Sequence, residues 1–439
     1  MAKKRLFSEF IGNVTQNVAG MLGISFYILA DTFFISLSLG AEGLAALNFS
    51  LAVFSVMYGL GLMIGIGGAA RRSILLSLGK NEDAEKILIN SLYLGGITSF
   101  ILMIAGIFFS SEISLAMGAD SETIHHSNVY MSTMLCFSPC FVLNYIVSAY
   151  VRNDGNSKIS MAAMLISSLA NILLDYVFIF RFSLGMYGAV FATGLSPIIS
   201  LAVLCTHLKS KRNTVKLVFS RPDVKRMLSQ LKLGLSSFIG EFSSAVTVTV
   251  FNLVLLKAGG NTAVAAYGIV ANTALVASSV FNGISQGVQP LASRECSDVK
   301  KKSRIVRYSI ITAITTSAVL FAAVFLCAEF ITAVFNSGND PVLAKLSVRG
   351  MRIYFAGFLF AGLNIVTAAF FSAVDMPKQA FIISLLRSAA VVVPMVLILG
   401  YFLEIDGVWL SFAAAEFSAC VASVICIIAS KRADRMKIR

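Results

Sequence analysis

The residues best suited to chemistry are two polar side chains within an almost wholly apolar stretch, residues 165–180. Asn171 and Asp175 are four apart, so on a helix they would project from the same face. An ionised carboxylate in hydrocarbon costs roughly 3 kcal/mol on insertion scales, so it needs a partner, a cation or water. Two interpretations follow: Asp175 is hydrated near a membrane surface, or it is one ligand of a coupling-cation site.

A second polar set recurs at steps of three or four within residues 10–38. A helix facing lipid could not carry such a stripe, so we expect this face to line the interior or a cavity. Its acidic member could instead cap the outer end of the helix, because Gly40 follows closely. The stripe consists of Asn13, Gln16, Asn17, Gly20, Tyr27 and Asp31. Four of its members are candidates for substrate contact: Asn13, Gln16, Asn17 and Tyr27.

The elements that must position these side chains are transmembrane helices. The chain has 439 residues, of which 57% are hydrophobic and 13% charged, whereas soluble proteins are about a quarter charged. Apolar runs of about 20 residues recur without alternation, which favours helices over a barrel. We predict an all-α polytopic membrane protein with twelve spans, at residues 10–38, 44–70, 87–110, 128–150, 159–181, 186–207, 231–256, 263–290, 305–328, 349–371, 379–401 and 406–430.

The basic residues predict the orientation of these spans. Placing both termini in the cytoplasm puts 29 of the 35 Lys and Arg on the inner side of the cell (plasma) membrane, as the positive-inside rule expects. This charge would face the anionic lipids of the inner leaflet, so the net charge of +13 does not indicate nucleic acid. A basic cytoplasmic linker, residues 209–232, is expected to separate an N-terminal lobe, residues 1–208, from a C-terminal lobe, residues 233–439.

The two halves repeat at an offset of 220 residues. Six helices per half is an even number, so the halves are parallel repeats related by an axis along the membrane normal. In secondary transporters with such repeats the substrate path lies between the halves, and alternating access is rocking of one against the other. The offset pairs Gly40 with Gly260, Gly67 with Gly287 and Ser73 with Ser293, and a further one-residue shift pairs Gly188 with Gly407.

Polar residues of the second half could line the same interior. Glu241, Asn272 and Gln286 are candidates for substrate contact, although structural pairing or interhelical hydrogen bonds would also explain them. Arg387 and Glu416 are expected to pair with each other across neighbouring spans. The seven cysteines are expected to be buried, without a disulfide framework. No nucleotide-binding or hydrolase motif is present, so we predict no enzyme.

Three stretches, residues 30–50, 65–86 and 258–291, resemble multidrug and toxic compound extrusion (MATE) transporters of the bacterial multidrug branch. The resemblance covers nearly the whole chain. It implies two six-helix lobes around a central cleft. It also implies an antiporter that exports drugs, organic cations among them, in exchange for Na+ or H+. No other cofactor is expected, and the partners would be small-molecule substrates and membrane lipid, with the chain working as a monomer.

The same resemblance implies a cation site in the first lobe, with ligands at Asp31, Asn171, Asp175 and Thr193. Two carboxylates, an amide and a hydroxyl suit a hard metal cation such as Na+. Some members of that family use a glutamate on the seventh span, in the second lobe, and the resemblance places this residue at Glu241. The acidic residue that those members also carry on the tenth span has no counterpart here. The proline that bends the first span in some relatives is also absent, and Gln16 stands near its position.

An alternative within the same superfamily is a flippase for a lipid-linked oligosaccharide. Such a protein would need Arg and Lys inside its cleft to hold a pyrophosphate, and few basic residues fall within the spans.

Overall fold

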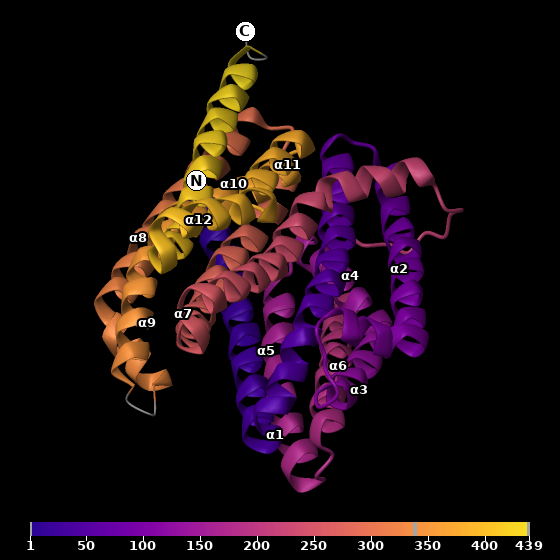
Figure 1. Ribbon diagram of the computed structural model, residues 1–439. Coiled ribbons are helices and arrows are strands. Elements are labelled where there is room, and N and C mark those ends of the chain that lie inside the picture. Colours follow the sequence, from indigo (N-terminus) through magenta and orange to yellow (C-terminus); the bar gives the residue numbers. More distant parts are fainter. Residues whose placement is uncertain (1, 337–339, 437–439) are drawn as a thin grey trace.

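The computed structural model describes residues 2–336 and 340–436, and in these ranges the regular structure is helical throughout (Figure 1). The first half contains α1 (Ala2–Ser77), α2 (Asn81–Ala116), α3 (Ile124–Cys136), α4 (Ser138–Asn153), α5 (Ser157–Tyr176), a π-helix (Val177–Arg181) and α6 (Gly185–Cys205), followed by a 3-10 turn (Thr206–Lys209). The second half contains α7 (Val224–Arg294), α8 (Val299–Phe335), α9 (Pro341–Tyr354), a 3-10 turn (Phe355–Gly357), α10 (Phe358–Ala373), α11 (Pro377–Leu386) and α12 (Ala389–Met436).

These helices provide the twelve predicted spans. Nine helical segments of the described residues are long and apolar enough to cross a membrane, and a tenth span is formed by α3 and α4, which meet at a 50° bend. Two of the nine segments, Val224–Arg294 and Pro377–Arg432, are 71 and 56 residues long and contain a backbone break. Each is therefore two spans, and the protein is a multi-pass membrane protein of twelve helices.

The internal repeat is visible in the backbone breaks. Gly40 (φ 61°, ψ −147°) divides α1, and its repeat partner Gly260 (φ 66°, ψ −162°) divides α7 in nearly the same conformation. Residues that carry a Cβ atom rarely adopt this positive-φ conformation, which explains why glycine stands at both positions. Gly185 begins α6 at φ 54°, and the matching residue after the one-residue shift, Glu404, breaks α12 at φ 50°.

The repeat also determines how the lobes meet. A Cβ atom on Gly67 would lie 2.1 Å from the backbone oxygen of Gln230, and one on Gly287 would lie 2.7 Å from the Cα of Val14. Gln230 and Val14 lie on the first spans of opposite halves, so each half presents its second span to the first span of the other. Backbones approach this closely only where a helix interface carries small residues.

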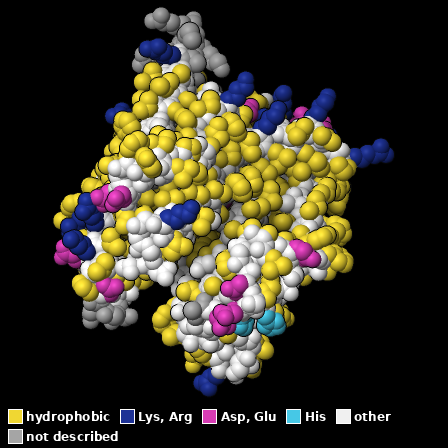
Figure 2. All heavy atoms as spheres, viewed as in Figure 1, with side chains coloured by type: hydrophobic (Ala, Val, Ile, Leu, Met, Phe, Trp, Pro, Cys, Tyr) yellow, Lys and Arg dark blue, Asp and Glu magenta, His cyan; other side chains and the backbone are white. Residues whose placement is uncertain are grey.

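Polar contacts between the lobes are gathered near the segment 210–223, which joins them. Arg71 pairs with Asp375 at 3.3 Å, and Arg294 pairs with Glu9 at 2.7 Å. The repeat-related hydroxyls of Ser73 and Ser293 both donate to Asn153 Oδ1, at 3.3 and 3.1 Å. We call this end of the molecule the linker end. Lys and Arg side chains stand along it, and the surface is notched between the lobes at the opposite end (Figure 2).

The linker itself is fastened to the N-terminal lobe by one buried carboxylate. Asp154 accepts from His207 Nε2 at 2.8 Å and from the backbone N–H of Thr214 at 2.7 Å, and Arg72 lies 3.5 Å away. The guanidinium of Arg72 also donates to the carbonyl of Thr214 at 2.7 Å. The division at residues 208/209 and 232/233 stays a prediction.

Two expectations about side-chain environment are wrong. Arg72 and Arg152 were counted among the residues that face inner-leaflet lipid, yet both are buried, because each has polar partners inside the protein. The cysteines were expected to be buried, but Cys136, Cys205 and Cys327 are exposed on helix surfaces. A thiol is apolar enough to face lipid, so its burial does not follow from an apolar span.

Candidate functional site

The acidic residues of the first lobe lie in its interior, where α1 and α5 pack closely. A Cβ on Gly20 would lie 2.8 Å from Met164 Sδ, and one on Gly23 would lie 2.7 Å from Leu165 Cδ2. These contacts run side by side along the two helices toward Asp31 and Asp175. Both carboxyl side chains are buried: Asp31 is 5% exposed and Asp175 is 0% exposed.

α6 adds a hydroxyl to this group. The amide nitrogen of Asn171 donates to Thr193 Oγ1 at 3.3 Å, and both residues are buried. This bond turns the amide so that Asn171 Oδ1 remains without a hydrogen-bond partner. All four residues expected in the cation site therefore lie in the core of one lobe, on α1, α5 and α6.

The buried oxygens of this group lack donors. Asp31 Oδ1, Asn171 Oδ1 and both carboxylate oxygens of Asp175 have no hydrogen-bond partner among the described residues. Asp31 and Asp175 also form no ion pair with a described Lys, Arg or His, although they are close enough to interact electrostatically with each other. Buried acceptors are almost always satisfied in proteins, so these oxygens are suited to accept from a bound donor or to coordinate a cation.

Two phenols border the acidic pair. Tyr27, on the same helix as Asp31, and Tyr130, on α3, both interact electrostatically with Asp31 and Asp175. Tyr130 was not singled out from the sequence, because nothing in its local pattern distinguishes it from a core aromatic.

The oxygens present fit a small hard cation or a proton. Asp31 and Asp175 supply charge, and Asn171 and Thr193 supply neutral oxygens, which is the ligand chemistry that hard cations prefer. Within residues 2–336 and 340–436 no group of three or more His, Cys, Asp and Glu is arranged to hold a metal ion.

The residues expected to contact substrate fall in three places. Tyr27 lies beside the acidic pair, as described above. Asn13, Gln16, Asn17 and Gln286 lie where the first span meets α7 at the linker end, and a Cβ on Gly283 would lie 2.5 Å from the Cα of Val18 there. Asn272 is half-buried on the part of α7 that follows the break at Gly260, and Glu241 lies on the part that precedes it.

Gln286 is already engaged by a buried arginine. Arg152 Nη1 donates to Gln286 Oε1 at 2.5 Å across the lobe interface, and Arg152 is 3% exposed. Arg152 has no carboxylate partner among the described residues, and its Nε makes no hydrogen bond. Arg152 was not predicted from the sequence because it lies one residue before the end of α4, where a charged residue is expected to be exposed in a loop. Asn17 similarly donates to the carbonyl of Asn13 at 2.8 Å.

Glu241 faces the first lobe. A Cβ added to Gly59 of the first lobe would lie 3.3 Å from the Cβ of Glu241. The carboxyl group of Glu241 interacts electrostatically with Tyr58 and Tyr145. Tyr58 and Tyr145 pack edge to face with ring centroids 4.8 Å apart. The three side chains form a polar and aromatic cluster between the lobes.

The second lobe has its own buried carboxylate, but this one is fully partnered. Glu416 accepts from Arg387 at 3.1 Å and from the amide of Asn364 at 2.8 Å, and Ser423 donates to Asn364 Oδ1 at 2.8 Å. The expected pairing of Arg387 with Glu416 is confirmed.

Comparison with known proteins identifies the family. A sequence profile of the MatE family matches residues 18–177 and 237–398, one block in each half. The chain belongs to the MatE family. Members of the MatE family are transporters, not enzymes, which confirms the predicted absence of an enzyme active site. The multidrug export protein MepA of Staphylococcus saprophyticus is 27% identical over 421 residues, covering 95% of this chain and 90% of MepA. MepA of Staphylococcus aureus is 26% identical over 433 residues, covering 98% and 92%.

Solved MatE structures share the fold. An outward-facing multidrug resistance MATE transporter of the MOP superfamily superposes with a TM-score of 0.88 at 22% identity, covering 98% of this chain and 95% of that one. A mutant of the VcmN MATE transporter of Vibrio cholerae gives a TM-score of 0.89 at 18% identity, covering 99% of both chains. The predicted fold, two six-helix lobes related as parallel repeats around a central cleft, is confirmed.

Proposed function

We propose that this chain is a multidrug exporter that couples efflux of organic cations to entry of Na+ or H+. The observation that carries the proposal is the set of unpartnered buried oxygens on Asp31, Asn171 and Asp175. A buried carboxylate pair without a fixed positive partner is a poor structural element, but it is well suited to an ion that arrives and leaves. The similarity to two MepA multidrug export proteins supports the export of drugs.

The coupling works through differential affinity. Asp31, Asp175, Asn171 and Thr193 would hold the cation, whose charge offsets the two carboxylates when it is bound. A ligand shifts a conformational equilibrium only by the difference between its affinities for the two states. Loading and emptying this pocket would therefore alter the packing of α1 against α5 and bias the rocking of the lobes.

The lobe interface supplies the moving contacts. The bonds from Arg152 to Gln286 and from Arg71 to Asp375 close the linker end, and both would have to break for that end to open. Drug would occupy the space between the lobes, where Glu241 offers a negative charge and Tyr58 and Tyr145 offer aromatic faces to an organic cation.

The test is efflux of ethidium from proteoliposomes in which the Na+ and pH gradients are clamped independently. We expect one of the two gradients to drive efflux in the native protein. We expect Asp31→Asn together with Asp175→Asn to abolish driven efflux while the protein remains folded. The matched control is Glu112→Gln together with Glu122→Gln, which removes two exposed carboxylates from the same lobe. Native-rate driven efflux by the double Asn variant would overturn the proposal.

The flippase alternative is distinguished in the same vesicles. Movement of a lipid-linked pyrophosphate without any ethidium efflux would favour it over drug export.

A further inference from the structure

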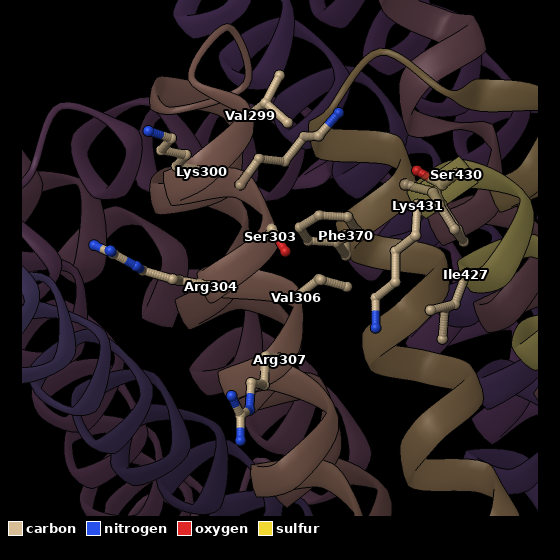
Figure 3. A pocket seen from close by; sticks show the side chains of 12 residues that line it. Val299, Lys300, Ser303, Arg304, Val306, Arg307, Phe370, Ile427, Ser430 and Lys431 are labelled. Carbon is tan, nitrogen blue, oxygen red and sulfur yellow. The ribbon is translucent and has the colours of Figure 1, made fainter. Parts of the chain in front are cut away.

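A basic cavity of about 640 Å3 lies in the second half of the chain, and none of the residues of the acidic pair's site lines it. It is formed by the first two turns of α8, by α10 and by the end of α12 (Figure 3). Its residues are Val299, Lys300, Lys302, Ser303, Arg304, Val306, Arg307, Phe370, Phe371, Ile427, Ser430 and Lys431. The lining thus contains five basic residues and no acidic one.

The cavity has a polar mouth and an apolar floor. Val306, Phe370 and Ile427 are buried, whereas Arg307 and Lys431 are exposed. Lys431 reaches from α12 into the space between the helices, with Ser303 and Val306 opposite it on α8 (Figure 3). Lys300 and Arg304 point away from that space in the same view, toward the rim.

Four basic side chains of the cavity have no carboxylate partner among the described residues. Lys300, Arg304, Arg307 and Lys431 form no ion pair with any residue in the described ranges, whereas the adjacent Lys301 pairs with Glu295 at 2.8 Å. Like charges around one concavity repel one another and attract anions. The arrangement is therefore complementary to a group that carries negative charge and hydrogen-bond acceptors.

The surroundings of the cavity select the kind of anion. On α8 the residues one and two turns beyond Arg307, Ile311 and Ile314, are exposed, and on α12 so are Val424 and Ile428. These apolar surfaces continue from the cavity into the membrane-spanning part of both helices, so they can accommodate acyl chains. Basic pockets between transmembrane helices at this level are known to suit lipid headgroups.

We propose that this cavity binds the phosphate headgroup of an anionic phospholipid from the leaflet at the linker end. Arg307 and Lys431 contact the phosphate, Ser303 donates a hydrogen bond, and the acyl chains lie along the exposed faces of α8 and α12. A lipid held there bridges α8 to α12 and so stabilises the outer wall of the second lobe. The site is independent of the drug and cation sites proposed above.

The experiment measures lipid binding to the purified full chain in detergent by native mass spectrometry, together with thermal unfolding. The probes are dioleoyl phosphatidylglycerol, dioleoyl phosphatidylcholine and inorganic phosphate. We expect one tightly held phosphatidylglycerol that raises the Tm, and no comparable effect from the other two. Arg307→Gln together with Lys431→Gln should weaken that binding by about 30-fold, from the loss of two charges near the membrane surface.

The matched control is Lys80→Gln together with Lys158→Gln, which removes two exposed charges from the linker end of the other lobe. It should bind phosphatidylglycerol as the native chain does. Equal binding of phosphatidylcholine, equal stabilisation by inorganic phosphate alone, or native binding by the Arg307→Gln, Lys431→Gln variant would each overturn the proposal. If that variant does not fold, Lys431→Gln alone carries the same test, because Lys431 is exposed.

Discussion

The two lobes each bury acidic side chains, but they treat them in opposite ways. In the second lobe Glu416 receives hydrogen bonds from Arg387 and Asn364, so its charge is compensated by the protein. In the first lobe both oxygens of Asp175 lack a partner in the described structure. The second half thus holds a carboxylate fixed by an internal cation, whereas the first half holds a pair available to an external one.

The difference explains why the acidic pair of the first lobe, and not Glu416, is the candidate for ion coupling. Arg387 is covalently attached and cannot be exchanged, so Glu416 contributes the same interaction in every conformational state that keeps the helices together. Asp31 and Asp175 acquire compensation only when an ion or proton is bound. An occupancy-dependent free energy is what a coupling site requires.

The largest expected effect is on transport. Asp175→Asn removes one charge from the unpartnered pair, and we expect gradient-driven ethidium efflux to fall by at least about 100-fold, since loss of even an outer-shell ligand costs about 10–100-fold in affinity. The Tm of the purified protein should stay the same or rise, because an uncompensated buried charge has been removed. Efflux in proteoliposomes and thermal unfolding of the same preparation check the two halves of this prediction. A variant that pumps normally would remove Asp175 from the coupling mechanism.

The opposite pattern is expected in the second lobe. Arg387→Met leaves Glu416 buried without its cation, which should lower the stability of the fold by about 3–5 kcal/mol. Transport per folded molecule should fall far less than with Asp175→Asn, although Arg387 also interacts electrostatically with Glu241. The double variant Arg387→Met, Glu416→Gln should recover most of the lost Tm, because no unpaired charge remains. If Arg387→Met has the same Tm as the native protein yet loses coupled transport, the distinction between the two carboxylate environments is wrong.

The lobe interface should be sensitive to one added methyl group. Gly67→Ala would drive a Cβ into the backbone of Gln230, and we expect a loss of about 1–3 kcal/mol of stability, typical of overpacking. Gly287→Ala should be milder, because its nearest contact is 2.7 Å rather than 2.1 Å. Gly96→Ala is the control, since a Cβ there meets nothing within 4 Å. Thermal unfolding of the three variants tests this order. If Gly67→Ala and Gly287→Ala lowered the Tm no more than Gly96→Ala does, the reciprocal packing of the two halves would be contradicted.

Much of the fold follows from local features of the sequence. Apolar runs of the right length predict spans, and the recurrence of Gly40 as Gly260 predicts parallel repeats, since both signals are carried by consecutive residues. The spacing of Asn171 and Asp175 likewise indicates a shared helix face. Partners that depend on tertiary packing could not be predicted in this way.

Arg152 illustrates that limit. The sequence gives no indication that a cation at the end of a span is buried against Gln286, because the acceptor comes from the other lobe. Similarly, nothing around Tyr130 or Tyr58 indicates that these phenols border the carboxylates, since their positions depend on how several helices pack together.

The smallest expected effect concerns a positive-φ position at which the two repeats use different residue types. Gly185 and Glu404 both have φ near 50°, but only glycine adopts that region without a penalty. Glu404→Gly should therefore raise stability, by about 1 kcal/mol or somewhat more, because strained backbone of this kind costs about 1–3 kcal/mol and the added freedom of glycine in the unfolded chain offsets part of the gain. Glu404→Gln is the control: it removes the charge and keeps the strain, so its Tm should match the native value. A rise in Tm with Gln as large as that with Gly would mean that the exposed charge of Glu404, not its backbone conformation, is what makes this half of the repeat less stable.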